Sequence, residues 1–294
     1  MTTTADPGAP LVPDDLVLSH FSLGRFLPFE ERVRAANDAG FRGIGFYVGD
    51  YQRLRHEGRT DADLRSILDD AGLRLVEIEA LRGWSADGHG RSSYRALEDA
   101  VFALNDALGP AETVQVIGPF DGDLDDAAAA FAGVCDRAAA HGLAAAIEFL
   151  PEMSNIPDAA TAMDIVRRAG RDNGGLCVDV WHHYRGANDE AMLRAIPPGR
   201  IFTVQFNDGP RRRVDTDYYT DCTRFRLPPG EGDFDLVRYL QLLDGMGVRR
   251  PLSVEVLSSA LQQQPPGAVA RRLASQTRKV VTTARVSNLQ RAET

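Results

Sequence analysis

The stretch LAAAIEFLPEMSNIPDAATAMDIVRRAGRDNGGLCVDVWHH, residues 143–183, contains one complete strand–helix–strand unit. LAAAIEFL (143–150) and GLCVDVWHH (175–183) are short apolar runs, whereas DAATAMDIVRRAG (158–170) has the spacing of a helix that ends at a glycine. Two apolar runs joined by a helix are typical of neighbouring parallel strands with a crossover connection. This unit therefore predicts a parallel sheet covered by helices.

The same alternation continues in both directions along the chain. The expected strands cover residues 16–22, 43–48, 74–81, 113–118, 143–150, 175–183, 201–208 and 251–258. The expected helices cover residues 28–40, 61–72, 92–108, 125–142, 158–170, 188–196, 234–247 and 267–286. Eight alternations favour an α/β fold that closes into a single (β/α)8 barrel over an open sheet. No glycine-rich phosphate loop follows a strand, which argues against nucleotide binding.

We expect one catalytic domain over residues 15–285, with a disordered lead over 1–14 and a C-terminal tail over 286–294. The length of 294 residues would also allow two domains, but a single α/β barrel often exceeds about 200 residues. The N-terminal segment lacks the basic and apolar stretches of a secretory signal, and no segment has the roughly 18 apolar residues of a membrane span. A cytoplasmic protein without a membrane partner is therefore expected.

Charge and cysteine content narrow the range of partners. The net charge of −9 argues against a nucleic-acid partner, because proteins that grip phosphate backbones usually present a basic face. The three cysteines, Cys135, Cys177 and Cys222, form no CxxC pair, so neither a disulfide framework nor a zinc knuckle is indicated.

One connection is far longer than an ordinary loop. The segment GPRRRVDTDYYTDCTRFRLPPGEGD, residues 209–233, separates the seventh strand from the helix that follows it. Long loops in compact domains are usually functional or disordered. In a barrel this loop lies on the face that carries the active site, so we expect it to cover a substrate.

The last four strands each carry one polar side chain inside an apolar run: Glu148 in AAAIEFL, Asp179 in LCVDVW, Gln205 in FTVQFND and Glu255 in LSVEVL. A buried carboxylate is costly unless it is paired or bound to a cation. A single acid of this kind is as often a loop anchor or an arginine partner. Four in successive strands favour a site for one divalent metal ion at the C-terminal ends of the strands.

These residues resemble a known superfamily. IEF on the fifth strand, DxxH from Asp179 to His182, VEV on the eighth strand, LSHFSLG…AANDAGFRGIGF and RLPPGEGDFD are similar to the xylose isomerase-like TIM barrel superfamily. More narrowly, they resemble its sugar phosphate isomerase/epimerase branch, which includes ketose 3-epimerases, inosose isomerases and dehydratases, and 3-dehydroshikimate dehydratases. The similarity covers residues 16–258.

The resemblance implies that Glu148, Asp179, Gln205 and Glu255 bind the metal ion, and that His182 contacts the substrate. It also implies that Arg211 meets substrate oxygens, and the branch often forms homo-oligomers. Many epimerases carry a histidine where this chain has Gln205, whereas dehydratase-like relatives carry a glutamine. An all-oxygen ligand set favours Mn²⁺ or Mg²⁺ over Zn²⁺, and Co²⁺ is also compatible.

Three further residues are candidates for the substrate pocket. His20 could line the pocket or be a satisfied core histidine. Glu79 could face the substrate, although a pairing with Arg82 or another basic side chain is the simpler interpretation. Trp84 could stack on a sugar or cyclitol ring, but packing would explain it equally well.

Several functions fit this set. The favoured one is a metal-dependent isomerase or epimerase of a keto-sugar or keto-cyclitol, a small polyhydroxy ketone of carbohydrate metabolism. Glu148 and Glu255 would then transfer a proton through a metal-stabilised enediolate. The first alternative is a lyase, a dehydratase of a 3-dehydroshikimate- or inosose-like substrate in which His182 or a glutamate removes the proton. The second is a non-catalytic barrel that acts as a binding or accessory protein.

Overall fold

The computed structural model describes residues 10–85 and 91–292 of the chain. Its centre is a closed barrel of eight parallel strands, in which each strand pairs with the next and β1 also pairs with β8. The strands are β1 (Leu16–Leu18), β2 (Gly43–Tyr47), β3 (Arg74–Arg82), β4 (Thr113–Ile117), β5 (Ala144–Glu148), β6 (Gly174–Asp179), β7 (Ile201–Phe206) and β8 (Leu252–Val254). The expected fold, a single (β/α)8 barrel, is thereby confirmed.

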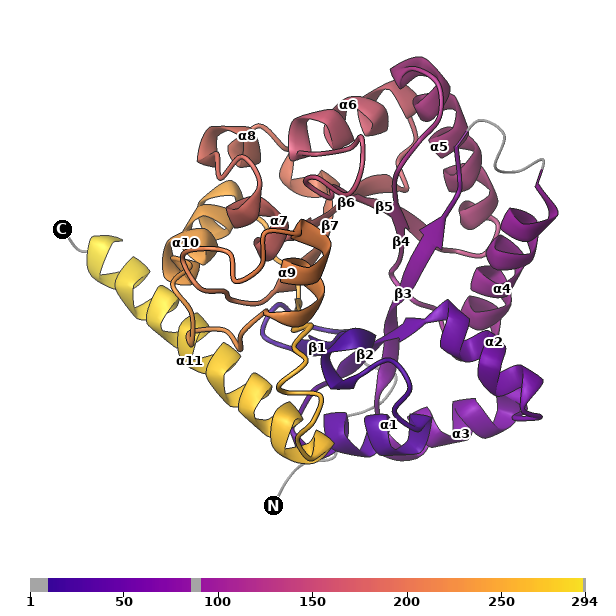
Figure 1. Ribbon diagram of the computed structural model, residues 1–294, viewed down its shortest axis with the longest axis horizontal. Helices are drawn as coiled ribbons and strands as arrows, with labels where there is room; N and C mark the ends of the chain where they lie inside the picture. The colour runs from indigo at the N-terminus through magenta and orange to yellow at the C-terminus, as the bar shows by residue number, and fades with distance from the viewer. Residues whose placement is uncertain (1–9, 86–90, 293–294) are drawn as a thin grey trace.

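The helices surround the strands and, in the case of one short helix, cover the mouth of the barrel (Figure 1). They are α1 (Phe29–Asp38), α2 (Val48–His56), α3 (Asp61–Ala71), α4 (Ser92–Leu108), α5 (Leu124–Ala139), α6 (Ala159–Ala169), α7 (Val180–Arg185), α8 (Glu190–Arg194), α9 (Tyr218–Arg224), α10 (Leu236–Met246) and α11 (Pro266–Ala292). The short helix α9, which was not predicted, lies in the long segment after β7, over the mouth of the barrel (Figure 1).

β6 is shorter than predicted. The strand ends at Asp179, and residues 180–183, which were expected to extend it, belong to α7. The Asp179 carboxylate accepts a 2.8 Å hydrogen bond from the backbone N–H of Trp181 and so caps the helix. Because of this early change from strand to helix, His182 lies about one helical turn beyond Asp179 and faces the same end of the barrel.

The ends of the domain also differ from the expected boundaries. α11 continues to Ala292, so most of the predicted tail is helical, because residues 286–292 contain neither glycine nor proline. Residues 1–9 of the predicted lead lie outside the described residues. Asp14, at the end of that lead, accepts a 2.9 Å hydrogen bond from Arg285 of α11, so this part of it is held in place.

The inside of the barrel is unusually polar. Such barrels are normally filled by branched apolar side chains, but here Ser253 and Gln115 both donate hydrogen bonds to the buried carboxyl of Glu77. Burial raises the pKa of Glu77 to about 7, and it raises that of Glu79 well above its ordinary value. Gly45 on β2 leaves room for these acids, because a Cβ there would collide with Glu79. The acids of β3 are thus enclosed below the mouth of the barrel.

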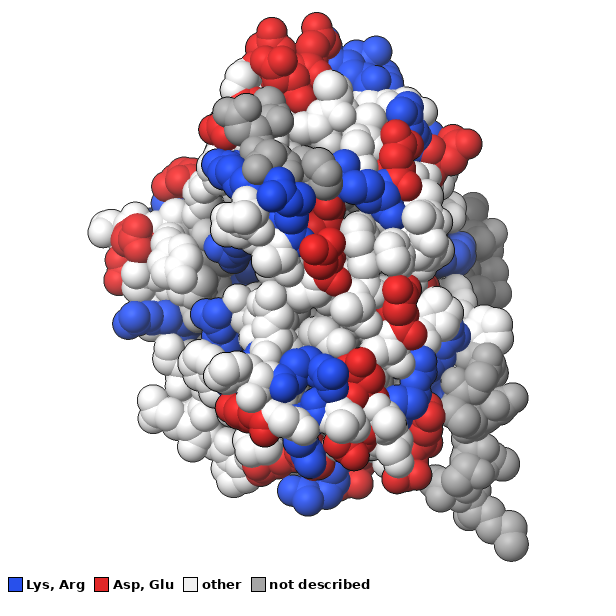
Figure 2. Space-filling model, turned by 90° about the vertical axis from the view of Figure 1, so that its right-hand side faces the viewer, with Lys and Arg blue, Asp and Glu red and all other residues white. Residues whose placement is uncertain are grey.

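The outer surface is mixed in charge. On the face drawn in Figure 2, acidic and basic side chains lie interspersed. Among the described helices, none has the length and apolar character that crossing a membrane requires.

Candidate active site

The four polar residues predicted from the last four strands lie at the C-terminal end of the barrel. Glu148 and Asp179 are the last residues of β5 and β6. In the strand register, Asp179 pairs with Gln205 of β7, and Gln205 pairs with Ser253 of β8, two residues before Glu255. Glu148 and Glu255 keep 7% and 5% of their surface exposed, whereas Asp179 and Gln205 keep none. The two glutamates are therefore the members that an incoming molecule can touch.

His182 joins two of these acids. Its Nε2 lies 3.2 Å from Glu148 Oε1 and 3.5 Å from Asp179 Oδ2. One ligand atom from each of the three residues lies within 4.8 Å of the others, a spacing that one metal ion can bridge. On the other side of the ring, Nδ1 lies 2.8 Å from the hydroxyl of Tyr218 on α9. The predicted substrate-contacting histidine is thus fixed between the acids and the segment that covers the barrel.

Arg226, which we did not predict, is the buried cation of the group. Its Nη1 donates to Asp179 Oδ2 at 2.7 Å and to Glu255 Oε2 at 3.0 Å, and its Nε donates to the Cys222 carbonyl at 3.0 Å. Although burial opposes the charge, the attraction of Asp179 and Glu255 raises the pKa of Arg226 well above its ordinary value. Arg226 therefore balances part of the negative charge of the site.

Asp208 holds Arg226 in position. Its backbone pairs with Leu227 in an antiparallel bridge, which folds the long segment back toward the barrel. Its carboxylate accepts hydrogen bonds of 2.9–3.1 Å from three backbone N–H groups of the motif RLPPGEGDFD, those of Gly230, Gly232 and Phe234. A Cβ at Gly232 would collide with Asp208, so the motif needs a glycine there. The motif is therefore a brace that fixes Arg226, the residue before Leu227.

The hydrogen bonds of the Gln205 side chain indicate whether the site fits a metal ion. Its Nε2 donates to Glu255 Oε1 at 3.1 Å, whereas its Oε1 is buried and has no hydrogen-bond partner among the described residues. An unsatisfied buried acceptor costs about 1–3 kcal/mol, and a cation would remove that cost. The free amide oxygen beside buried carboxylates fits one divalent ion.

His20 follows β1 and Glu79 lies on β3, and the His20 backbone N–H donates to Glu79 Oε1 at 3.1 Å. The His20 ring is buried, with Nε2 3.0 Å from the Arg25 carbonyl, and burial lowers its pKa well below the ordinary value. His20 is thus a neutral buried histidine. Arg82 is exposed, and the basic side chain that acts on Glu79 is Arg32, which agrees with the second of the two expected partners, another basic side chain.

The structure does not bring Trp84 or Arg211 to this group. Trp84 is 1% exposed; its Nε1 donates to the Ile117 carbonyl at 3.1 Å, and its ring meets Phe131 of α5 edge to face. Trp84 therefore packs between the barrel and the helices, in agreement with the second of its two interpretations. Arg211 is exposed, and its backbone N–H donates to Asp233 at 2.8 Å. The long segment folds back after Arg211, so the arginine that reaches the site is Arg226.

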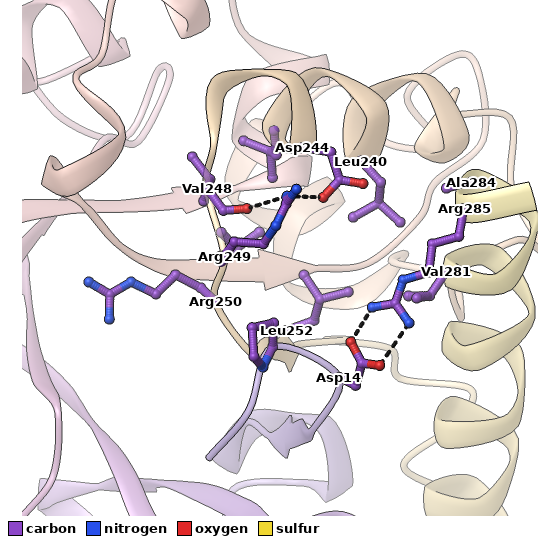
Figure 3. A pocket seen from close by; sticks show the side chains of 13 residues that line it. Asp14, Leu240, Asp244, Val248, Arg249, Arg250, Leu252, Val281, Ala284 and Arg285 are labelled. Carbon is purple, nitrogen blue, oxygen red and sulfur yellow. Dashed lines mark hydrogen bonds and ion pairs between the residues drawn. The ribbon is translucent and has the colours of Figure 1, made fainter. Parts of the chain in front are cut away.

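Two cavities lie at opposite ends of the barrel. One, of about 500 Å³, opens at the mouth and is lined by residues that include Arg82, Leu150 and Tyr218. The other, of about 540 Å³, lies between α10 and α11 near the start of β8 (Figure 3). Its acids are already paired, Asp14 with Arg285 and Asp244 with Arg249. Of these two cavities, the first adjoins the acidic group, since Tyr218 contacts His182.

A closed barrel of eight parallel strands surrounded by helices defines the (β/α)8-barrel class, and the buried acids lie at the C-terminal ends of the strands, where such barrels carry their functional sites. The chain belongs to the xylose isomerase-like TIM barrel family, which matches residues 33–279. Relatives that match by sequence include a dehydratase and an isomerase.

Three known proteins illustrate the similarity. The 3-dehydroshikimate dehydratase of Pseudomonas aeruginosa is 31% identical over 256 residues, which cover 85% of this chain and 39% of that protein. The inosose isomerase of Bacillus velezensis is 32% identical over 123 residues, which cover 41% of this chain and 42% of that protein. The crystal structure of the IolI protein with a bound zinc atom superimposes with a TM-score of 0.82 at 17% identity, covering 92% of this chain and 99% of that one. The chain thus spans about two fifths of either relative matched by sequence.

Proposed function

We propose that the chain is a divalent-metal-dependent dehydratase that removes water from a cyclic hydroxy ketone similar to 3-dehydroshikimate. The observation that carries the proposal is the unequal environment of Glu148 and Glu255, the two glutamates that keep a small accessible surface. Glu255 accepts hydrogen bonds from Ser19, Gln205 and Arg226, whereas the described contact of Glu148 is with His182 alone. An epimerase needs two free bases on opposite faces of the substrate, but a dehydratase needs only one. The sequence similarity to a dehydratase over most of the chain supports the same choice.

His182 is the base in this proposal. Its Nε2 would accept the proton next to the substrate carbonyl, a carbon–carbon double bond would form, and the hydroxyl on the next carbon would leave. The imidazolium can then return the proton to the departing hydroxyl, so that the net loss is one water molecule. The Tyr218 hydroxyl can donate to Nδ1 or accept from it, so it holds the ring while Nε2 gains and loses a proton.

The residues that would hold the metal ion are Glu148, Asp179, Gln205 and Glu255. A divalent ion bound there would polarise the substrate carbonyl and stabilise the negative charge that develops as the proton leaves. Because these four residues offer only oxygen, we propose Mn²⁺ or Mg²⁺.

The proposal is tested with purified protein treated with EDTA and then reloaded with Mn²⁺. With 3-dehydroshikimate we expect an unsaturated, ultraviolet-absorbing product that forms only in the reloaded protein. Inososes and ketohexoses are incubated in parallel in D₂O. Deuterium uptake without loss of water would instead identify an isomerase or epimerase, and turnover that is indifferent to EDTA would contradict the metal site.

The second candidate remains an isomerase or epimerase of a keto-sugar or keto-cyclitol. The partial exposure of both Glu148 and Glu255 favours it, because both can reach a bound substrate. The partial match to an inosose isomerase points in the same direction.

Changing Tyr218 to phenylalanine removes the hydrogen bond to His182 and little else. We expect turnover to fall roughly 10-fold, as is common when the partner of an active-site histidine is lost. The free energy of unfolding should change by less than about 1.5 kcal/mol. Turnover as a function of pH and urea unfolding measure the two effects. Tyr51→Phe is the control, because it removes the 2.9 Å hydrogen bond from Tyr51 to Asp61 and Tyr51 lines neither of the two cavities described above; an equal loss of turnover in both variants would contradict the role of Tyr218.

A further inference from the structure

The cavity at the mouth of the barrel carries three charged side chains, Arg82, Glu152 and Asp217. Glu152 pairs with Arg213 at 3.0 Å. Asp217 caps α9 by accepting a 2.9 Å hydrogen bond from the Thr220 backbone N–H. The side chain of Arg82 is exposed and has no ion pair or hydrogen bond with any residue that the structure describes. It is therefore the charge of this cavity that is available to a ligand.

Arg82 lies at the level of the acidic group. It is the last residue of β3, and its Cα pairs with Ile117, which in turn pairs with Glu148. Two strand spacings separate Arg82 from Glu148, which is roughly 10 Å between backbones. Tyr218 connects the two regions, since it lines the cavity and contacts His182. A small ring molecule can therefore extend from the acidic group toward the guanidinium.

The rest of the lining limits the charge of such a ligand. Ile117, Leu150 and Met153 are apolar, which strengthens the attraction between a guanidinium and an anion in their vicinity. A carboxylate needs one cation and matches a guanidinium with two parallel hydrogen bonds. A phosphate dianion would need more positive charge and would also meet the acids Glu152 and Asp217.

We propose that Arg82 binds the carboxylate of the substrate and makes the site selective for cyclic hydroxy keto acids over neutral keto-sugars and keto-cyclitols. The inference rests on the proposed function, because it assumes that the acidic group at the ends of β5–β8 holds the ketone end of the same molecule. Arg82 is a specificity residue in this scheme, and the proton transfer does not pass through it.

Binding without turnover tests the role of Arg82 separately from the reaction. The probes are shikimate, which has a hydroxyl in place of the ketone, and its uncharged methyl ester, titrated calorimetrically into Mn²⁺-loaded protein. We expect Arg82→Gln to weaken shikimate binding about 10-fold and methyl shikimate binding less than about 3-fold. Arg82→Lys should retain part of the affinity for shikimate. Raising NaCl to 0.5 M, about three times physiological ionic strength, screens charges. It should therefore weaken shikimate binding to the unsubstituted protein more than to Arg82→Gln.

Arg212→Gln is the matched control, because Arg212 is also an exposed arginine after a barrel strand but does not line the cavity. It should leave both affinities unchanged. Equal weakening of both probes by Arg82→Gln, or no binding of shikimate to the unsubstituted protein, would overturn the inference. If the selectivity for the charged probe depends on Arg82 but no dehydration is observed, the proposed function fails while the carboxylate site stands. If dehydration of the acid proceeds with an unchanged KM in Arg82→Gln, the carboxylate site fails while the proposed function stands.

Discussion

Replacing Glu148 with glutamine is expected to lower turnover by roughly 10²- to 10⁴-fold, the range in which a group that acts directly in proton transfer or charge stabilisation contributes. Glutamine keeps the size of the side chain but removes the negative charge that a divalent ion would bind. Glu148 contacts His182 and is not part of the Arg226 ion pairs, so the fold should tolerate the change. Metal analysis, steady-state kinetics and urea unfolding of Glu148→Gln measure the three expectations.

Glu112→Gln provides the matched control. Glu112 precedes β4 at the opposite end of the barrel and lies 3.8 Å from Arg250, so it should affect neither metal content nor turnover. If Glu148→Gln retains the activity and metal content of the unsubstituted protein, the acidic group is not the catalytic centre. If Glu148→Gln also leaves the cellular function intact, the alternative of an accessory protein gains support.

Replacing Arg226 with methionine should destabilise the metal-free protein by about 3–5 kcal/mol, because removal of one partner leaves buried carboxylates without a counter-charge. The affected acids are Asp179 and Glu255, which Arg226 contacts at 2.7 and 3.0 Å. A divalent ion is expected to restore part of the loss, since it binds the folded protein and supplies positive charge to the same acids. Urea unfolding in EDTA and in excess Mn²⁺ measures both quantities.

Arg272→Met separates this effect from the loss of an ordinary ion pair. Arg272 pairs with Glu231 and is partly exposed, so its removal should cost less than about 1 kcal/mol with or without Mn²⁺. An Arg226→Met protein that unfolds like Arg272→Met, or one whose stability Mn²⁺ does not raise more than that of the unsubstituted protein, would show that Arg226 does not balance the acids.

The barrel could be predicted from sequence because hydrophobic spacing decides which segments become strands and helices. Glu148, Asp179, Gln205 and Glu255 could be selected for a similar reason, since a polar residue inside a buried strand is costly without a partner. Prediction from the sequence fails where the chain leaves this regular pattern of apolar spacing. The start of α7 depends on a cap made by one side chain, Asp179, which apolar spacing does not reveal.

The long segment after β7 shows the same limit at the site. Distance along the chain from Gln205 pointed to Arg211, but the bridge between Asp208 and Leu227 brings Arg226 to the acids instead. The motif RLPPGEGDFD was recognised as a resemblance, and its role as a brace depends on hydrogen bonds that only the structure reveals. From the sequence, Trp84 fits stacking on a substrate ring and packing in the core equally well. In the structure its side chain is buried and packs against Phe131 of α5.

The pairing of β1 with β8 has a consequence for protein synthesis. Glu148 and Asp179 leave the ribosome well before Arg226, and the hydrogen bond from Ser19 to Glu255 can form only when the last strand has been made. Until then the barrel cannot close, and the sheet of the nascent chain keeps two unpaired strand edges, those of β1 and β7. Open edges of this kind invite aggregation, so translation that stops before β8 would yield a product prone to precipitation and degradation.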